Sequence, residues 1–167
     1  MPRYAATFGS STILPYEKEY QEGIMIGSFL ADKGYIVKCG GYQGLMEAVS
    51  IGVKEAGGEC IGITLKAFNR RRPKNENLSK EIVVDNLHDR VKLLCKNCSL
   101  FVIQKGSIGT LNELFTVWAI KYASLDNFRI CMVGKEWDAL KNCSLIDKNL
   151  LKFLEFYKDA NEFMKRF

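Results

Sequence analysis

A glycine-rich turn with two hydroxyl side chains separates an apolar segment from a helix-like segment. It reads Lys105-Gly106-Ser107-Ile108-Gly109-Thr110 and follows the apolar run 100–103. Glycines let a backbone approach a ligand closely, and the free amides and positive dipole end of a following helix suit a phosphate. Ser107 and Thr110 add hydroxyl donors. The turn therefore predicts a phosphate site, although a plain strand-to-helix turn would use the same residues.

Two charged residues flank this turn in the sequence. Glu113 follows it, in the expected first turn of a helix over 109–124, and Arg90 lies in the helix expected over 87–97. Glu113 would lie beside the phosphate pocket and partly away from water. Its ordinary role would be to complement the helix dipole, worth about 0.3–1 kcal/mol. Arg90 could bind a phosphate or a carboxylate, whereas its helix position alone favours a surface arginine.

Other motifs are weaker or exclude whole classes of site. The turn Gly40-Gly41-Tyr42-Gln43-Gly44 is not G-x-G-x-x-G, and the chain contains no G-x-x-x-x-G-K-[ST] run. His88 is the only histidine, so the sequence argues against a metal site built from histidines and against a Ser-His-Asp triad. Cys95-x-x-Cys98 lacks a second pair to complete four zinc ligands and indicates buried structural thiols. We expect no metal and no cofactor.

Apolar segments of strand length alternate with segments of helical periodicity. Strands are expected at 4–8, 35–37, 60–64, 81–84, 100–103 and 130–133, and helices at 16–33, 45–55, 87–97 and 109–124. The polar, arginine-rich stretch 66–80 is expected to be a loop that attracts an anion or is simply solvated. Ile146, Leu150, Leu154 and Tyr157, spaced four, four and three residues apart, predict a last amphipathic helix.

This alternation predicts an α/β fold, a Rossmann-like open parallel sheet with helices on both faces. Ligands of such sheets bind at the carboxyl ends of the strands. Three strands run directly into glycine or serine clusters, which should lie along one edge of the molecule. These clusters are Gly9-Ser10-Ser11, Gly40-Gly41 and Gly106–Thr110.

Length and composition fit one domain over residues 1–167. The chain has a hydrophobic fraction of 47% and a net charge of 24 − 19 = +5, which excludes disordered and collagen-like classes. A pI near 8.8 favours an anionic small ligand and is below that of a dedicated nucleic-acid domain. No apolar run reaches membrane-spanning length, and no secretory signal is visible. Six cysteines without a signal suggest free thiols in the cytoplasm.

Several ordered blocks resemble the LONELY GUY family of cytokinin-activating phosphoribohydrolases, once mislabelled as lysine decarboxylases. Residues 105–113 are similar to the family hallmark P-G-G-x-G-T-x-x-E, and Leu87-His88-Asp89-Arg90-Val91 to its Met-His-x-Arg-Lys segment. The stretches 9–11, 40–49 and 57–63 look like the family's upstream blocks in the same order. Lys105, Ser107 and Val91 depart from the family's proline, second glycine and lysine.

The resemblance implies hydrolysis of the N-glycosidic bond of a nucleoside 5′-monophosphate to free base and ribose 5-phosphate, without metal or cofactor. Glu113 would stabilise an oxocarbenium-like transition state and orient water, and Arg90 would place the nucleotide and keep Glu113 ionised. The 106–110 turn would hold the phosphate, with Lys105 as an added contact. Gly40, Gly41, Ser10 and Ser11 would line the ribose and base.

The resemblance also leaves an alternative open and suggests an assembly. Because Lys105 and Ser107 depart from the family motif, the alternative function remains open. In it the protein binds its ligand without cleaving it, as a molybdenum-cofactor carrier or a nucleotide sensor of the same fold. Family relatives commonly form dimers through helices near the site. The helix that carries Glu113 is apolar on two sides, and its second side, around Val117 and Ile120, fits that expectation of a homodimer or higher homo-oligomer.

Overall fold

A computed structural model describes residues 1–124 and 126–167. One parallel sheet carries seven strands: β1 (Arg3–Phe8), β2 (Tyr35–Cys39), β3 (Cys60–Leu65), β4 (Lys80–Val84), β5 (Cys98–Ile103), β6 (Arg129–Val133) and β7 (Glu155–Tyr157). The helices are α1 (Lys18–Asp32), α2 (Leu45–Glu55), α3 (Lys66–Asn69), α4 (Leu87–Cys95), α5 (Ile108–Ser124) and α6 (Ala160–Arg166). Two 3-10 segments, η1 (Lys135–Asn142) and η2 (Lys148–Phe153), lie between β6 and β7.

The strand order has one reversal, and it creates the place where a ligand can bind. Strands follow the order β4-β3-β2-β1-β5-β6-β7, and every neighbouring pair is parallel. The chain therefore builds outward from β1 on one side as far as β4, and then builds from β5 to β7 on the other side. The crevice between the carboxyl ends of β1 and β5 is the switch point where open parallel sheets hold ligands. The predicted Rossmann-like sheet is confirmed.

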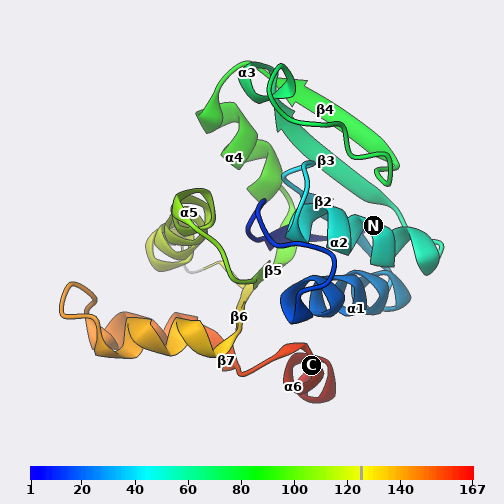
Figure 1. Cartoon of the computed structure of the whole chain (residues 1–167). Coiled ribbons are helices and arrows are strands. Elements are labelled where there is room, and N and C mark those ends of the chain that lie inside the picture. The colour runs from blue at the N-terminus through cyan, green and yellow to red at the C-terminus, as the bar shows by residue number, and fades with distance from the viewer. Residues whose placement is uncertain (125) are drawn as a thin grey trace.

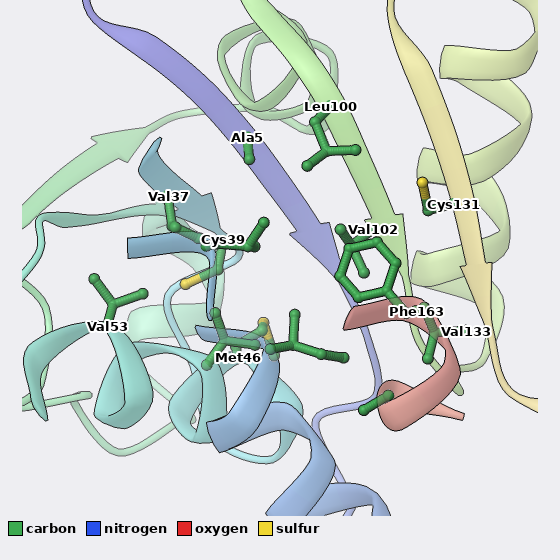
Figure 2. Close-up of a cluster of buried hydrophobic side chains, with 14 of the residues drawn as sticks. Ala5, Val37, Cys39, Met46, Val53, Leu100, Val102, Cys131, Val133 and Phe163 are labelled. Carbon is green, nitrogen blue, oxygen red and sulfur yellow. The ribbon is translucent and has the colours of Figure 1, made fainter. Parts of the chain in front are cut away.

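Helices cover both faces of the sheet, as Figure 1 shows. Successive strand residues point to opposite faces, so Ala5 packs with α1, α2 and α6, and Ala6 packs with α4, α5 and the 3-10 segments. Figure 2 shows the first of these cores, in which Phe163 from α6 lies against the strands near Val102 and Val133. Within the described residues, no helix has both the length and the apolar character to cross a bilayer.

Helices α1 and α2 approach each other closely because glycines form their contact. A Cβ atom on Gly27 would lie 2.1 Å from the carbonyl oxygen of Val49, and one on Gly52 would lie 1.9 Å from that of Ile24. No side chain fits at either position without separating the helices. This contact fixes α1 and α2 over β1 and β2, and so fixes the turns that precede both helices.

The predicted last helix is wrong. Residues 148–153 form a 3-10 segment, and Tyr157 belongs to β7, where it pairs with Val133 of β6. The four-four-three spacing arose because Ile146, Leu150 and Leu154 each pack on the same core from irregular or extended backbone. The true last helix begins later, at Ala160, where the Asp159 side chain accepts a hydrogen bond from the Glu162 amide. The start of this helix is therefore marked by its N-cap residue and not by the apolar periodicity.

Two other helices expose large apolar side chains. These are Leu87 of α4 and Phe115 and Tyr122 of α5. Cys98 is buried as expected, but it begins β5 rather than ending the preceding helix. The loop expected over 66–80 begins with the short helix α3.

Gly52→Ala is predicted to destabilise the protein. The new methyl group would overpack the α1–α2 contact, which typically costs about 1–3 kcal/mol, and this exceeds the gain of up to about 1 kcal/mol that alanine has over glycine in a helix. Urea unfolding followed by circular dichroism measures the change. Gly109→Ala is the matched control, because a Cβ there meets nothing within 4 Å; an equal loss of stability in the two variants would contradict the packing argument.

Candidate functional site

Two of the glycine and serine turns meet directly at the carboxyl edge of the sheet. The Ser10 amide donates to the carbonyl of Lys105 at 2.9 Å, and the Leu45 amide donates to the carbonyl of Ser10 at 2.8 Å. Gly44, with φ of +71°, is required here because a Cβ would lie 2.3 Å from the Ser10 carbonyl oxygen. The turns after β1 and β5 and the start of α2 are therefore tied into one edge, as the sequence predicts.

Arg90 crosses the top of this edge from the first turn of α4. The Asn86 side chain caps α4 by accepting from the Asp89 amide at 2.9 Å, which places Arg90 beside the sheet. Its Nε donates to the carbonyl of Ile63 at 2.8 Å and its Nη2 to the carbonyl of Gly40 at 3.0 Å. A Cβ on Gly40 would lie 2.3 Å from Nη2. The absence of a side chain at Gly40 is what lets the guanidinium reach β2.

Glu113 receives the remaining arm of the same guanidinium. Nη1 of Arg90 lies 3.4 Å from Oε1 of Glu113, and the two residues are only 8% and 7% exposed. Burial penalises the ionised carboxylate and raises the pKa of Glu113 to about 7, although the positive charge of Arg90 lowers that pKa. Near neutral pH both the protonated and the ionised carboxyl group are therefore populated, which suits a general acid or base.

Three details of this pair differ from the sequence-based expectation. Helix position alone favoured a surface location for Arg90, but its long side chain folds back over the sheet and is buried. Helix α5 begins at Ile108, so Glu113 lies in its second turn rather than its first. Arg90 was expected to keep Glu113 ionised, but burial outweighs the attraction and raises the pKa of Glu113.

The turn before α5 presents backbone donors to solvent. The first hydrogen bond of the helix runs from the Leu111 amide to the Ser107 carbonyl at 2.9 Å, so the amides of Ile108, Gly109 and Thr110 have no partner from the helix. Ser107, Ile108 and Gly109 are exposed. Thr110 is buried beneath the turn, where a Cβ on Gly106 would lie 2.0 Å from its Oγ1. The turn is thus folded tightly with open amides, as anion binding requires.

Other predicted binding residues have partners within the protein. Lys105 was expected to contact phosphate, but its Nζ pairs with Oε1 of Glu19 in α1 at 3.1 Å. The Ser10 hydroxyl lies 2.9 Å from the Thr12 hydroxyl and accepts from the Thr12 amide, whereas Ser11 is half-buried beside it. Gly41, with φ of +78°, packs against Thr64. Gly40 and Gly41 are both buried.

Sequence reasoning missed two groups that complete the site. The Tyr42 ring lies 5.7 Å from the Arg90 guanidinium, and its hydroxyl donates to Asn69 Oδ1 at 2.9 Å and accepts from the Leu65 amide at 2.7 Å. Its position inside the 40–44 turn was the available signal. The carbonyl of Ile63 is a backbone group in the middle of a strand, and no sequence pattern marks it.

The arrangement can stabilise positive charge next to an anion-binding turn. A carboxyl group with a pKa near 7, an adjacent guanidinium and a helix start with free amides lie within one edge of the sheet. Among residues 1–124 and 126–167, no three His, Cys, Asp or Glu side chains lie where they could hold a metal ion. The chemistry that these groups can perform is acid–base and electrostatic.

The chain is similar to a known protein family and to curated enzymes. The model of the SLOG cluster4 family matches residues 3–127. A cytokinin riboside 5′-monophosphate phosphoribohydrolase of Mycobacterium tuberculosis is 28% identical over 109 residues, which cover 65% of this chain and 58% of that protein. The cytokinin riboside 5′-monophosphate phosphoribohydrolase LOG5 of Arabidopsis thaliana is 35% identical over 86 residues, which cover 50% of this chain and 38% of that protein. The chain thus spans less than two thirds of these curated relatives, and the resemblance to the LONELY GUY family is confirmed.

Solved structures show that the fold extends over almost the whole chain. The molybdenum cofactor carrier protein of Chlamydomonas reinhardtii superposes with a TM-score of 0.79 at 19% identity, covering 99% of this chain and 96% of that one. The molybdenum cofactor binding protein of Rippkaea orientalis gives 0.78 at 16% identity, covering 99% and 95%. At these identities the likeness concerns the fold. Because the family match over residues 3–127 spans β1 to α5, the chain belongs to the SLOG cluster4 family.

Proposed function

We propose that this protein hydrolyses the N-glycosidic bond of a nucleoside 5′-monophosphate, giving a free base and ribose 5-phosphate. The observation that carries the proposal is the buried Arg90–Glu113 pair beside the open amides of α5, at the carboxyl edge of the sheet. The names of the curated relatives support the same reaction class. The molybdenum-cofactor alternative is supported by fold likeness alone.

In the proposed reaction the bond between C1′ of the ribose and the ring nitrogen of the base breaks, and its electron pair leaves with the base. The ribose becomes oxocarbenium-like, and the carboxylate of Glu113 stabilises the developing positive charge. Water adds to C1′ and its proton passes to Glu113, which the pKa near 7 permits. The proton then passes from Glu113 to the departing base, so that the products are neutral base and ribose 5-phosphate and the carboxylate is regenerated.

Binding energy at the phosphate would position C1′ for this step. The amides of Ile108, Gly109 and Thr110, together with the Ser107 hydroxyl, would hold the 5′-phosphate at the positive end of α5. Glu113 lies one helical turn further along, on the same helix. The distance between phosphate and carboxylate is therefore fixed by the helix, which suits a substrate that carries both phosphate and ribose.

We further propose that residues 1–167 act as one domain in the cytoplasm, without a nucleic-acid polymer as partner, metal or cofactor. The six cysteines support a reducing compartment, since all of them are free thiols.

Glu113→Gln and Arg90→Met are each predicted to lower kcat/KM for base release from AMP, CMP, GMP or UMP by at least about 100-fold. The first removes the charge that stabilises the transition state, and the second removes the cation that positions it. Chromatographic measurement of free base checks this, with adenosine as a poor substrate because it lacks the phosphate.

Matched controls are available on the exposed surface. Glu76→Gln and Arg71→Met make the same substitutions at exposed positions and should leave base release unchanged. Tight nucleotide binding with no base release in the wild-type protein would contradict the proposed reaction and favour the carrier or sensor alternative.

The protonation of Glu113 is predicted to make folding stability depend on pH between about 4.5 and 7. In this range the folded protein keeps a proton on Glu113 that the unfolded chain has lost, so the free energy of unfolding falls as pH rises and levels off above about pH 7. Glu113→Gln removes this titration. The variant should therefore gain stability relative to wild type from pH 5 to 8, by an amount on the order of 1–3 kcal/mol.

Urea unfolding at several pH values measures this difference, and the activity profile gives an independent reading. Because the ionised carboxylate is the active form, base release should rise with pH through about 7. Arg90→Met removes the charge that lowers the pKa of Glu113, so in that variant the stability change should extend to higher pH. A stability difference between wild type and Glu113→Gln that stays constant from pH 5 to 8 would show that Glu113 has an ordinary pKa.

We also propose a homodimer or higher homo-oligomer formed through α5, but by a different face from the one expected. Val117 is fully buried against the sheet and cannot meet a partner, whereas Ile120 is 38% exposed. Ile108, Phe115 and Tyr122, spaced seven residues apart on one face, are 80%, 43% and 61% exposed. A second copy of this chain would bury this apolar stripe beside the phosphate-binding turn.

Phe115→Glu is predicted to shift the protein towards monomer, because it places a charge in the middle of the apolar stripe. Sedimentation velocity at micromolar concentrations measures the change. Val83→Glu, on the exposed edge strand β4, is the control and should leave the assembly intact. A wild-type protein that is strictly monomeric at these concentrations would rule out the assembly.

A further inference from the structure

A cavity of about 260 Å³ lies at the carboxyl edge of the sheet, on the face covered by α1 and α6. Ile26, Leu45 and Val133 give it an apolar surface, and the 104–105 and 134–136 segments form part of its wall. Neither Arg90 nor Glu113 lines it, because they lie on the face covered by α4 and α5. The cavity is therefore separate from the site of the proposed hydrolysis.

Gln104 brings an unused amide group to this cavity. The residue is only 4% exposed, and its backbone amide donates to the carbonyl of Phe8 at 2.8 Å. Its side-chain carboxamide lines the cavity without a hydrogen bond to any residue of 1–124 or 126–167. The carboxamide is therefore free to bond a ligand in the cavity. The side chain points towards α1, where a Cβ on Gly23 would lie 3.4 Å from its Oε1.

The charges around the cavity balance each other. Four lysines and four acids line it: Lys18, Lys105, Lys135, Lys158, Glu19, Glu22, Glu136 and Asp159. Lys105 pairs with Glu19 at 3.1 Å and Lys18 with Glu22 at 3.0 Å, while Asp159 caps α6. With equal numbers of both signs, the lining has no net charge to attract a phosphate or a polycation. This charge balance favours a neutral ligand.

We propose that this cavity binds a nucleobase. A carboxamide offers a hydrogen-bond donor and an acceptor side by side, and this pair matches the adjacent acceptor and donor on a base edge, as glutamine matches adenine in other settings. Apolar side chains supply the surface against which a flat ring packs. The volume lies just below the range of pockets for drug-sized ligands, which suits a molecule as small as a base. This proposal does not depend on the proposed hydrolysis, because a free base can bind whether or not the protein cleaves nucleotides.

Isothermal titration calorimetry with adenine, cytosine and uracil tests the proposal. We expect saturable binding of at least one base to the wild-type protein, weakened about tenfold or more by Gln104→Met, which keeps the side-chain length and removes both hydrogen-bonding groups. Gln21→Met is the matched control, because Gln21 is an exposed residue of α1 outside the cavity. Its affinity should equal that of wild type. Benzimidazole, which lacks the polar edge of a base, should bind weakly.

Amide chemical shifts of the wild-type protein locate the ligand even if Gln104→Met fails to fold. Adenine should shift resonances of residues 18–22, 104–105 and 134–136 and leave those of 90 and 113 unchanged. The proposal is overturned by the absence of saturable binding, by equal binding of benzimidazole, or by shifts confined to residues around 90 and 113. A protein that binds base here but releases none from nucleotides would reject only the proposed hydrolysis.

Discussion

The geometry of the whole site depends on keeping one guanidinium and one carboxyl group together away from water. Removing a charge from water costs several kcal/mol, and a buried pair is stable only when the remaining hydrogen-bonding groups are satisfied. Arg90 meets this condition through the carbonyls of Ile63 and Gly40, which leave Nη1 to face Glu113. Among the residues that the structure describes, Arg90 is the one hydrogen-bond partner of the Glu113 carboxylate, so its burial is under-compensated. This imbalance raises the pKa of Glu113.

The parallel sheet supplies what such a pair requires from the backbone. Strand ends in a sheet of one direction leave carbonyl groups at the same edge, and the right-handed crossovers bring α4 and α5 to that edge from one face. Gly40 directly follows β2 and Ile63 lies in β3. Arg90 lies in the first turn of α4 and Glu113 in the second turn of α5. Four separate segments therefore converge, and each constrains the others. Position 40 tolerates the least change of residue type, because any side chain there would collide with the Arg90 guanidinium.

The sequence predicted those parts of the fold that local patterns determine. The strands, the crossover helices and the edge on which the glycine and serine turns lie follow from apolar periodicity and turn residues, and the structure has them within a few residues. The burial of Arg90 could not be read from helix position, because its side chain is long enough to leave its own helix face. The Lys105–Glu19 pair joins residues 86 positions apart, and no local pattern marks it. The last helix was predicted in the wrong place because the spacing of apolar residues carries no information about which residue caps a helix.

The pairing of Lys105 with Glu19 also bears on how this chain departs from the hallmark of its family. A lysine in place of a proline would add a positive charge next to the 106–110 turn, but Glu19 draws that charge towards α1. Exposed ion pairs of this kind contribute at most about 1 kcal/mol, so the pair restrains the lysine without fixing it. The turn itself is held by other means, namely the Ser10 amide on the Lys105 carbonyl and the close fit of Gly106 on Thr110. Because the backbone donors do not depend on the side chain at position 105, the substitution leaves the conformation of the turn intact.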